Sequence, residues 1–298
     1  LLQAGKEDPK IVAICADLTE STQMNLFKDE FPDRFIEIGV AEQNLVSVAS
    51  GMAKMSKTPF ISSYAAFCPG RSWEQIRTTI CLNDQNVKII GSHAGLGVGP
   101  DGATHQALED IALMRVLPNM QVFAPADSNE AARITMAVAK TKSPSYIRLS
   151  RQAVPVFTQE LGDFKIGEGI KLKDGHQITI LSTGTATWHA LQAGLKLKEE
   201  GVDAEVLHFP TIKPLDKRLI LESAQKTRRF VTVEDHQVAG GFGSAVAEVI
   251  SESFPIPIIR IGVEDKYGQS GTPDELFRLY GITSTNIVKK AHQLIKAT

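Results

Sequence analysis

Short apolar runs rich in β-branched residues alternate with segments of helical period along this chain. Continuous apolar runs of this kind are typical of parallel strands, because helices cover both faces of a parallel sheet. The segment 41–55 differs, since apolar residues such as Leu45 and Val48 recur there at three- and four-residue steps. The alternation predicts open α/β sheets with right-handed crossovers.

The chain divides into two stretches of this kind. Strands are expected in the first stretch at residues 10–15, 35–39, 59–63, 87–92, 121–124 and 145–149, and in the second at 177–181, 204–207, 230–234 and 256–261. Helices are expected in the second stretch at 185–200, from Asp216, from about Gly243, and at 273–280 and 285–296. A segment without helical period that contains Pro155 separates the two stretches. At 298 residues the chain has the length of two domains; we predict them at residues 1–155 and 165–298, with a linker at 156–164.

Composition excludes several classes of protein. With 32 Lys and Arg against 34 Asp and Glu, the chain lacks the basic surface of a nucleic-acid-binding protein. No apolar stretch approaches the roughly 18 residues of a membrane span, and the start at Leu1 has no signal-peptide pattern. The three cysteines are odd in number and lack metal-binding spacing. We therefore expect a soluble, cytoplasmic protein in which this chain holds no metal.

Polar residues that directly follow strands are the first candidates for a site, because ligands of open α/β sheets bind beyond the carboxyl ends of the strands. Asp17, Thr19 and Ser21 follow the first strand, although these residue types also favour helix starts. Glu42 follows the second strand, in the first turn of a largely apolar helix. Its carboxylate either only complements the helix dipole or, half-buried, holds and shares a proton in a reaction.

Two aromatic residues, Tyr64 and Phe67, follow the third strand and are separated by alanines. Small neighbours would let a flat ring of a ligand approach and stack, and ordinary core packing is the alternative. The fourth strand leads into a glycine-rich loop that carries His93, Asp101 and His105. A mobile surface loop is the alternative there, but such a loop does not require these three side chains together.

The same loop matches the dinucleotide-binding pattern G-x-G-x-x-G at residues 97–102, with Asp127 about twenty-five residues later. Three features oppose a dinucleotide site. The first glycine lies several residues beyond the strand, Asp101 would place a carboxylate against the pyrophosphate, and the two histidines would have no role.

Arg148 and Arg151 leave the last strand of the first stretch. Arginine is the preferred bidentate partner of phosphate, and ion pairs at the surface are the alternative.

Four segments in this order resemble the second half of transketolase: residues 39–44, 92–106, 125–130 and 149–152. The resemblance runs from about Lys10 to the end of the chain. It implies two open α/β domains, a thiamine-diphosphate-binding domain of the pyrimidine type followed by a domain of the transketolase C-terminal type. Transketolases use thiamine diphosphate and a divalent cation to move a two-carbon ketol unit between sugar phosphates.

The resemblance also implies roles for individual residues. Glu42 is the acid that hydrogen-bonds the pyrimidine ring nitrogen of the cofactor, and Tyr64 and Phe67 pack against that ring. Gly70 stands where the family has a third aromatic residue, and the resemblance assigns no role to Arg71 beside it.

The remaining implied roles concern the substrate. Asp101 meets a donor hydroxyl, and His105 meets a carbonyl or hydroxyl near the reacting carbon. His93, as an imidazolium, joins Ser21 and Arg151 around the acceptor phosphate. Asp17 makes a supporting contact.

The family's signature for the diphosphate and metal, Gly-Asp-Gly with an Asn some thirty residues later, is absent from the sequence. Either a partner chain supplies that part of the cofactor site, as in split transketolases, or the sequence is a fragment. We expect the first: a natural subunit, inactive alone, whose N-terminal partner chain holds the diphosphate and its Mg²⁺ or Ca²⁺. A heterotetramer with two copies of each chain is the expected assembly. The second domain, including the glycine-rich segment 234–243 with His236, is expected to serve mainly in subunit contact.

Three alternatives remain from the sequence: a 1-deoxyxylulose-5-phosphate synthase, the β subunit of a 2-oxo acid dehydrogenase, and a non-catalytic subunit. The synthase usually has Arg near the position of His93, and the dehydrogenase lacks the paired histidines. A non-catalytic subunit would not need Glu42, Asp101 and Arg151 together.

Overall fold

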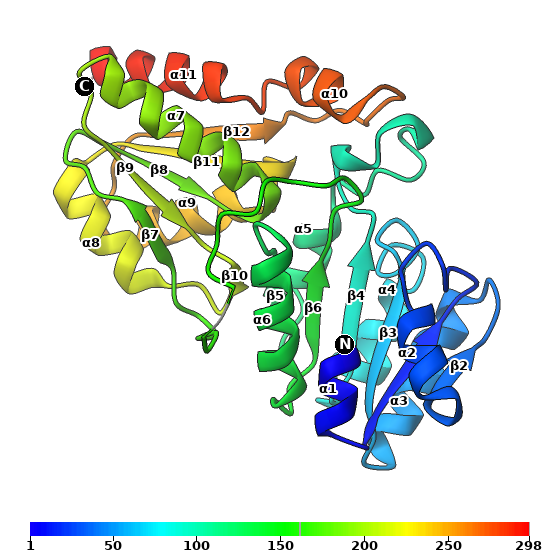
Figure 1. The fold of residues 1–298 in the computed structure, drawn as a ribbon. Helices are drawn as coiled ribbons and strands as arrows, with labels where there is room; N and C mark the ends of the chain where they lie inside the picture. The colour runs from blue at the N-terminus through cyan, green and yellow to red at the C-terminus, as the bar shows by residue number, and fades with distance from the viewer. Residues whose placement is uncertain (161, 298) are drawn as a thin grey trace.

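The computed structural model describes residues 1–160 and 162–297, and its elements form two sheets (Figure 1). The first sheet has seven strands in the order β10-β5-β6-β4-β3-β1-β2. Its strands are β1 (Ile11–Cys15), β2 (Phe35–Glu37), β3 (Thr58–Tyr64), β4 (Lys88–Ser92), β5 (Gln121–Phe123), β6 (Ser145–Arg148) and β10 (Thr211–Lys213). All its neighbours are parallel except β10, which pairs antiparallel with β5.

The second sheet has five strands in the order β12-β11-β8-β9-β7. Its strands are β7 (Ile170–Lys173), β8 (Ile178–Ser182), β9 (Ala204–His208), β11 (Phe230–Gln237) and β12 (Ile258–Val263). The edge strand β7 is antiparallel to β9, and the other pairs are parallel.

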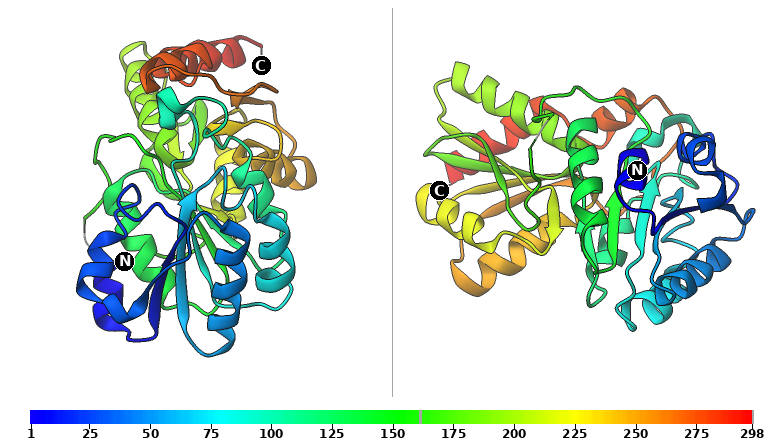
Figure 2. Two further views of the ribbon diagram at one scale, coloured as in Figure 1. Left: turned by 90° about the vertical axis from the view of Figure 1, so that its right-hand side faces the viewer. Right: turned by 60° about the horizontal axis from the view of Figure 1, so that its bottom comes forward.

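Helices cover both faces of each sheet (Figures 1 and 2). The helices of the first part are α1 (Leu2–Glu7), α2 (Asn25–Glu30), α3 (Glu42–Lys54), α4 (Trp73–Gln75), which continues as a π-helix over Ile76–Cys81, α5 (Asp110–Arg115) and α6 (Ser128–Ala139). Those of the second part are α7 (Thr187–Glu199), α8 (Lys217–Thr227), α9 (Phe242–Ser253), α10 (Pro273–Leu279) and α11 (Ser284–Ala297). Side chains of α1, α2 and α6 pack on one face of the first sheet and those of α3 on the other, while α7 and α11 lie opposite α8 and α9 on the second. None of the helices in the described residues is long and apolar enough to cross a membrane.

The predicted open α/β architecture is confirmed, and every strand expected from the sequence is present. The strands β7 and β10 were not expected. Both lie at sheet edges, where a strand needs few apolar residues, and β7 alternates Ile and Leu with two lysines.

One hydrophobic cluster contains residues of both parts of the chain. Val122 of β5 belongs to the same buried cluster as Leu181 of β8 and Phe209. Together with the pairing of β10 with β5, this cluster joins the second part of the chain to the edge of the first sheet. The boundaries at residues 155 and 165 stay a prediction about the chain's organisation.

Candidate functional site

Glu42 is the first residue of α3, and its side chain is only 2% exposed. Arg71, half exposed, donates a hydrogen bond from Nη1 to Glu42 Oε2 at 2.8 Å. The same guanidinium lies 4.9 Å from the centre of the Phe67 ring. Glu42 therefore occupies a helix N-terminus, as the dipole interpretation requires, but it also presents a buried carboxylate that is paired with an arginine.

Four rings converge beyond the carboxyl ends of β3 and β4. The rings of Tyr64 and Phe67 lie 6.2 Å apart, and His93 stacks on Tyr64 at 4.0 Å. His105 meets Phe67 edge-on at 5.4 Å. Tyr64 and Phe67 are only partly buried, which distinguishes them from aromatic residues of the core. The structure thus brings together two pairs of residues that the sequence analysis selected in two separate segments.

Gly70 has no room for a side chain. A Cβ atom there would lie 2.1 Å from the carbonyl oxygen of Ala66. An aromatic residue cannot stand at this position without moving the backbone. Arg71, the next residue, instead covers the edge of the site through Glu42 and Phe67.

A cavity of about 550 Å³ opens beside the ring cluster. Ser21, His93 and Arg151, the three residues selected for phosphate, all line it. Arg151 is half exposed and donates to Asp101 Oδ1 at 3.3 Å and to the carbonyl oxygen of Val98 at 3.1 Å. Asp101 is therefore close to this cavity, paired with the arginine that faces it.

Arg148, the other arginine of this segment, has a different place. Its Nε donates to both carboxylate oxygens of Asp110, at 3.1 and 3.0 Å, and its Nη2 donates to the carbonyl oxygen of Asp235 at 2.6 Å. Its side chain is 5% exposed. Arg148 thus follows the ion-pair interpretation, although the pair is buried rather than at the surface.

The surroundings of His93 in the free chain favour the neutral imidazole, whereas the expected contact with phosphate was that of an imidazolium. Burial, and then the charge of Arg151, lower the pKa of His93 to about 4 against the opposing effect of Asp101. The Ser92 hydroxyl lies 2.8 Å from Nδ1 and can donate to it, which leaves Nε2–H as a donor. His93 can therefore offer phosphate a neutral hydrogen bond.

The glycine-rich loop does not form a dinucleotide site. Residues Leu96–Asp101 form a 3₁₀ turn, and the next helix, α5, begins only at Asp110. The pattern at 97–102 therefore lacks the helix N-terminus that would hold a pyrophosphate.

His236 and Asp17 also lie outside the ring cluster. His236 is buried, accepts a hydrogen bond on Nε2 from the Ala112 amide at 3.3 Å, and lies 2.7 Å from the Gln237 carbonyl oxygen through Nδ1. These contacts describe a neutral histidine that joins the two parts of the chain, and burial lowers its pKa to about 4. The Asp17 amide donates to Glu37, and the Asp17 residue is exposed.

Arg71 and Asp235 are the site's neighbours that the sequence analysis did not assign. Arg71 closely follows the aromatic residues Tyr64 and Phe67, so its position in the sequence could have indicated that it lies near the site. Asp235 directly follows the expected strand 230–234, which was also a signal, but its contact to the glycine-rich loop could not be foreseen because it joins residues far apart in sequence. Among the described residues no group of three or more His, Cys, Asp and Glu is arranged to hold a metal ion.

Comparison with known proteins shows which family the chain belongs to. The model of the transketolase pyrimidine-binding domain matches residues 1–156, and that of the transketolase C-terminal domain matches residues 167–287. A putative transketolase C-terminal section from Methanocaldococcus jannaschii is 43% identical over 300 residues, which cover 99% of this chain and 94% of that protein. Rat transketolase is 39% identical over 300 residues, covering 99% of this chain but 48% of the relative.

A solved structure is also similar over nearly the whole chain. A split-gene transketolase, described as an inactive β4 tetramer, superimposes with a TM-score of 0.92 at 45% identity and covers 99% of this chain and 95% of that one. The earlier resemblance is thereby confirmed: the chain belongs to the transketolase family and carries its pyrimidine-binding and C-terminal domains.

Proposed function

We propose that this chain is the C-terminal subunit of a two-chain transketolase that transfers a two-carbon ketol unit from a ketose phosphate to an aldose phosphate. One observation carries the proposal. A buried carboxylate, Glu42, lies at the edge of a cluster of partly exposed rings, and that cluster adjoins the cavity lined by Ser21, His93 and Arg151. The site thus offers a surface for a flat heterocycle next to a set of phosphate ligands.

The residues present fit the aminopyrimidine of thiamine diphosphate. Glu42 offers a carboxylate for a ring nitrogen, and Tyr64 and Phe67 offer partly exposed faces. When bound, thiamine diphosphate would supply the reactive carbon that carries the two-carbon unit. Because the sequence lacks the diphosphate and metal signature, we assign the diphosphate and its Mg²⁺ or Ca²⁺ to an N-terminal partner subunit.

Glu42 would hold and exchange a proton with the ring nitrogen it contacts. In the free chain Arg71 occupies Glu42 Oε2, so the ring must share or displace that hydrogen bond.

Substrate contacts would rearrange a second ion pair. Arg151 is paired with Asp101 in the free chain. A phosphate in the cavity would draw Arg151 toward itself and toward Ser21 and His93, leaving Asp101 free to accept from a donor hydroxyl. His105, edge-on to Phe67, would meet oxygen atoms near the reacting carbon.

The assembly and setting form part of the same proposal. We assign a heterotetramer with two copies of each chain, a cytoplasmic location, and pentose phosphates as substrates. The three cysteines are free and buried, which favours a reducing compartment.

Activity of the chain with and without its partner tests the proposal. We expect no ketol transfer from xylulose 5-phosphate by the chain alone and turnover when the partner, thiamine diphosphate and Mg²⁺ are added. Glu42→Gln should lower kcat of the two-chain enzyme by roughly 10²–10⁴-fold, the usual contribution of a positioned acid or base. The exposed Glu74 supplies the control, since Glu74→Gln should leave the rate unchanged.

Two results would contradict the proposal. Turnover by the chain alone would exclude dependence on a partner, and full activity of Glu42→Gln would exclude its role. Release of CO₂ from pyruvate with glyceraldehyde 3-phosphate, in place of ketol transfer, would support the synthase alternative.

A further inference from the structure

The glycine-rich loop of the first domain is attached to a carboxylate of the second sheet. The Leu96 amide donates to Asp235 Oδ1 at 3.1 Å, and Asp235, near the carboxyl end of β11, is 3% exposed. The loop also packs tightly there, because a Cβ on Gly95 would lie 2.0 Å from Asp235 Oδ2. Gly95 has a φ of +78°, a conformation that glycine adopts easily. The loop thus meets Asp235 through one hydrogen bond and direct contact.

Asp235 is itself held in place by Arg148. Arg148 Nη1 lies 3.8 Å from Asp235 Oδ2, and Nη2 donates to the Asp235 carbonyl oxygen at 2.6 Å. Arg148 also donates to Asp110 and to the carbonyl oxygen of Ala107, where the loop ends. A buried, multiply bonded arginine leaves Asp235 little freedom. The loop is therefore hydrogen-bonded at Leu96 to Asp235 and at Ala107 to Arg148, and Asp235 and Arg148 are themselves in contact.

The attached segment carries the residues that the proposed function uses. His93 lies three residues before Leu96 and has a φ of +52°, which side chains other than glycine rarely adopt. On the other side, the Val98 carbonyl accepts a hydrogen bond from Arg151, and Asp101 pairs with the same guanidinium. A displacement of Leu96 would therefore change the separation of His93, Asp101 and Arg151.

We propose that Asp235 is a positioning residue: through the Leu96 amide it sets the loop so that His93 lines the proposed phosphate cavity together with Arg151 and Asp101 pairs with Arg151. This inference rests on the proposed function. It gives the second domain a part in substrate binding, in addition to any part in subunit contact.

Two substitutions separate positioning from a merely structural role. Asp235→Ala and Asp235→Asn both remove the charge that faces Arg148, but only asparagine keeps an oxygen that can accept from the Leu96 amide. In the two-chain enzyme, Asp235→Ala should raise KM for the phosphorylated acceptor about tenfold, the equivalent of one hydrogen bond to a charged group. Asp235→Asn should restore KM to within about threefold of the wild-type value, and kcat should change little in both.

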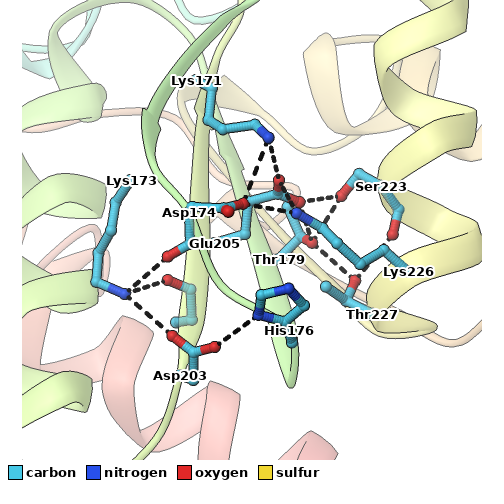
Figure 3. Close-up of polar contacts among 11 residues, drawn as sticks. Lys171, Lys173, Asp174, His176, Thr179, Asp203, Glu205, Ser223, Lys226 and Thr227 are labelled. Carbon is cyan, nitrogen blue, oxygen red and sulfur yellow. Dashed lines mark hydrogen bonds and ion pairs between the residues drawn. The ribbon is translucent and has the colours of Figure 1, made fainter.

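Glu205 supplies a matched control in the same domain (Figure 3). It is 1% exposed, accepts from Thr179 at 3.0 Å and from Ser223, and pairs with Lys226. It lies near the amino end of β9, whereas Asp235 lies near the carboxyl end of β11. Glu205→Ala should lower thermal stability but leave KM unchanged.

Amide hydrogen exchange provides a readout that needs no activity. In the full chain without substrate, Asp235→Ala should speed exchange at Leu96 and its loop, whereas Asp235→Asn and Glu205→Ala should not. If the wild-type enzyme showed no ketol transfer, the proposed function would fail while the exchange result still tested the attachment.

The inference is overturned if folded Asp235→Ala keeps wild-type KM or wild-type loop exchange, or if Asp235→Asn raises KM as much as alanine does. Should Asp235→Ala not fold, Gly95→Ala disturbs the same contact from the loop side. It should raise KM similarly, and an unchanged KM would be equally decisive against the role of this contact.

Discussion

At the scale of single residues, the site of the free chain is occupied by ion pairs between its own side chains. Arg71 holds Glu42, and Arg151 holds Asp101. Arg151 and Asp101 are both partly exposed, so their pair costs little to exchange for a ligand. Glu42 is buried, so a ring that displaces Arg71 must offer the carboxylate a hydrogen bond in its place. A ring nitrogen would compete for Glu42, and a phosphate would compete for Arg151. Without a ligand, each of these carboxylates therefore has an arginine as its partner, and a bound ligand would replace one member of the pair.

Arg151→Ala tests the phosphate assignment at this scale. We expect KM for phosphorylated sugars to rise about tenfold or more, with kcat within a few-fold of wild type, because a charge-assisted contact contributes about 1.5–3 kcal/mol. Steady-state kinetics with a phosphorylated and an unphosphorylated acceptor measure the difference. Arg218, an exposed residue of α8, is the control. A slower kcat with unchanged KM would assign Arg151 to the chemical step instead.

At the scale of elements, Asp127 joins a helix to the connection between the two parts. It is the N-cap of α6, where Oδ1 accepts from the Glu130 amide at 3.1 Å. Its Oδ2 accepts from the amides of Phe157 and Thr158 at 2.8 and 2.7 Å. Although burial alone would raise the pKa of Asp127, hydrogen bonds from Thr158 and these amides lower it. The predicted linker is therefore bonded to the first domain where it begins.

Asp127→Ala should destabilise the chain by about 2–4 kcal/mol, because it removes a helix cap and leaves the buried Glu130 amide and the partly buried amides of Phe157 and Thr158 without an acceptor. Asp127→Asn keeps some of these acceptors and should lose less. Thermal or urea unfolding monitored by circular dichroism measures both. The exposed Asp33 gives a reference, since Asp33→Ala should change stability by less than about 0.5 kcal/mol. Equal stability of Asp127→Ala and wild type would show that the linker contacts contribute nothing.

At the scale of the whole molecule, buried polar contacts join the two parts. His208 Nε2 lies 2.7 Å from Glu130 Oε2, across the boundary between β9 and α6. His236 accepts from the Ala112 amide, and Arg148 connects Asp110 with Asp235. Each contact is satisfied only when the parts are docked. The orientation of the two sheets is thus specified by hydrogen bonds as well as by the shared core.

The buried histidines predict loss of stability in acid. The pKa values of His93 and His236 are lowered from 6.5 to about 4, chiefly by burial. Between these values the unfolded chain binds more protons than the folded one, so stability falls as the pH drops from 6.5 toward 4. Melting temperatures across this range measure the effect. His236→Gln should flatten the dependence, whereas His176→Gln, at an exposed position, should not; a pH-independent melting temperature would refute the linkage.

The sequence by itself determined the open α/β architecture, the strands other than the edge strands β7 and β10, and the residues to consider. Strand and helix patterns arise between residues close in the chain, so they can be read without the fold. Glu42, Tyr64 and Phe67 could also be selected from the sequence, because they follow strands. Ligands of open α/β sheets bind beyond the carboxyl ends of the strands. The roles of these residues stay predictions, but their proximity to His93 and His105 is visible in the structure.

Only the tertiary structure decided the rest. The pairing of β10 with β5, the hydrogen bond of Arg71 to Glu42, and the neutral state of His93 depend on packing and burial. The contact between Leu96 and Asp235 joins residues 139 positions apart. No local pattern records such a contact, because its energy exists only once both sheets are formed and docked.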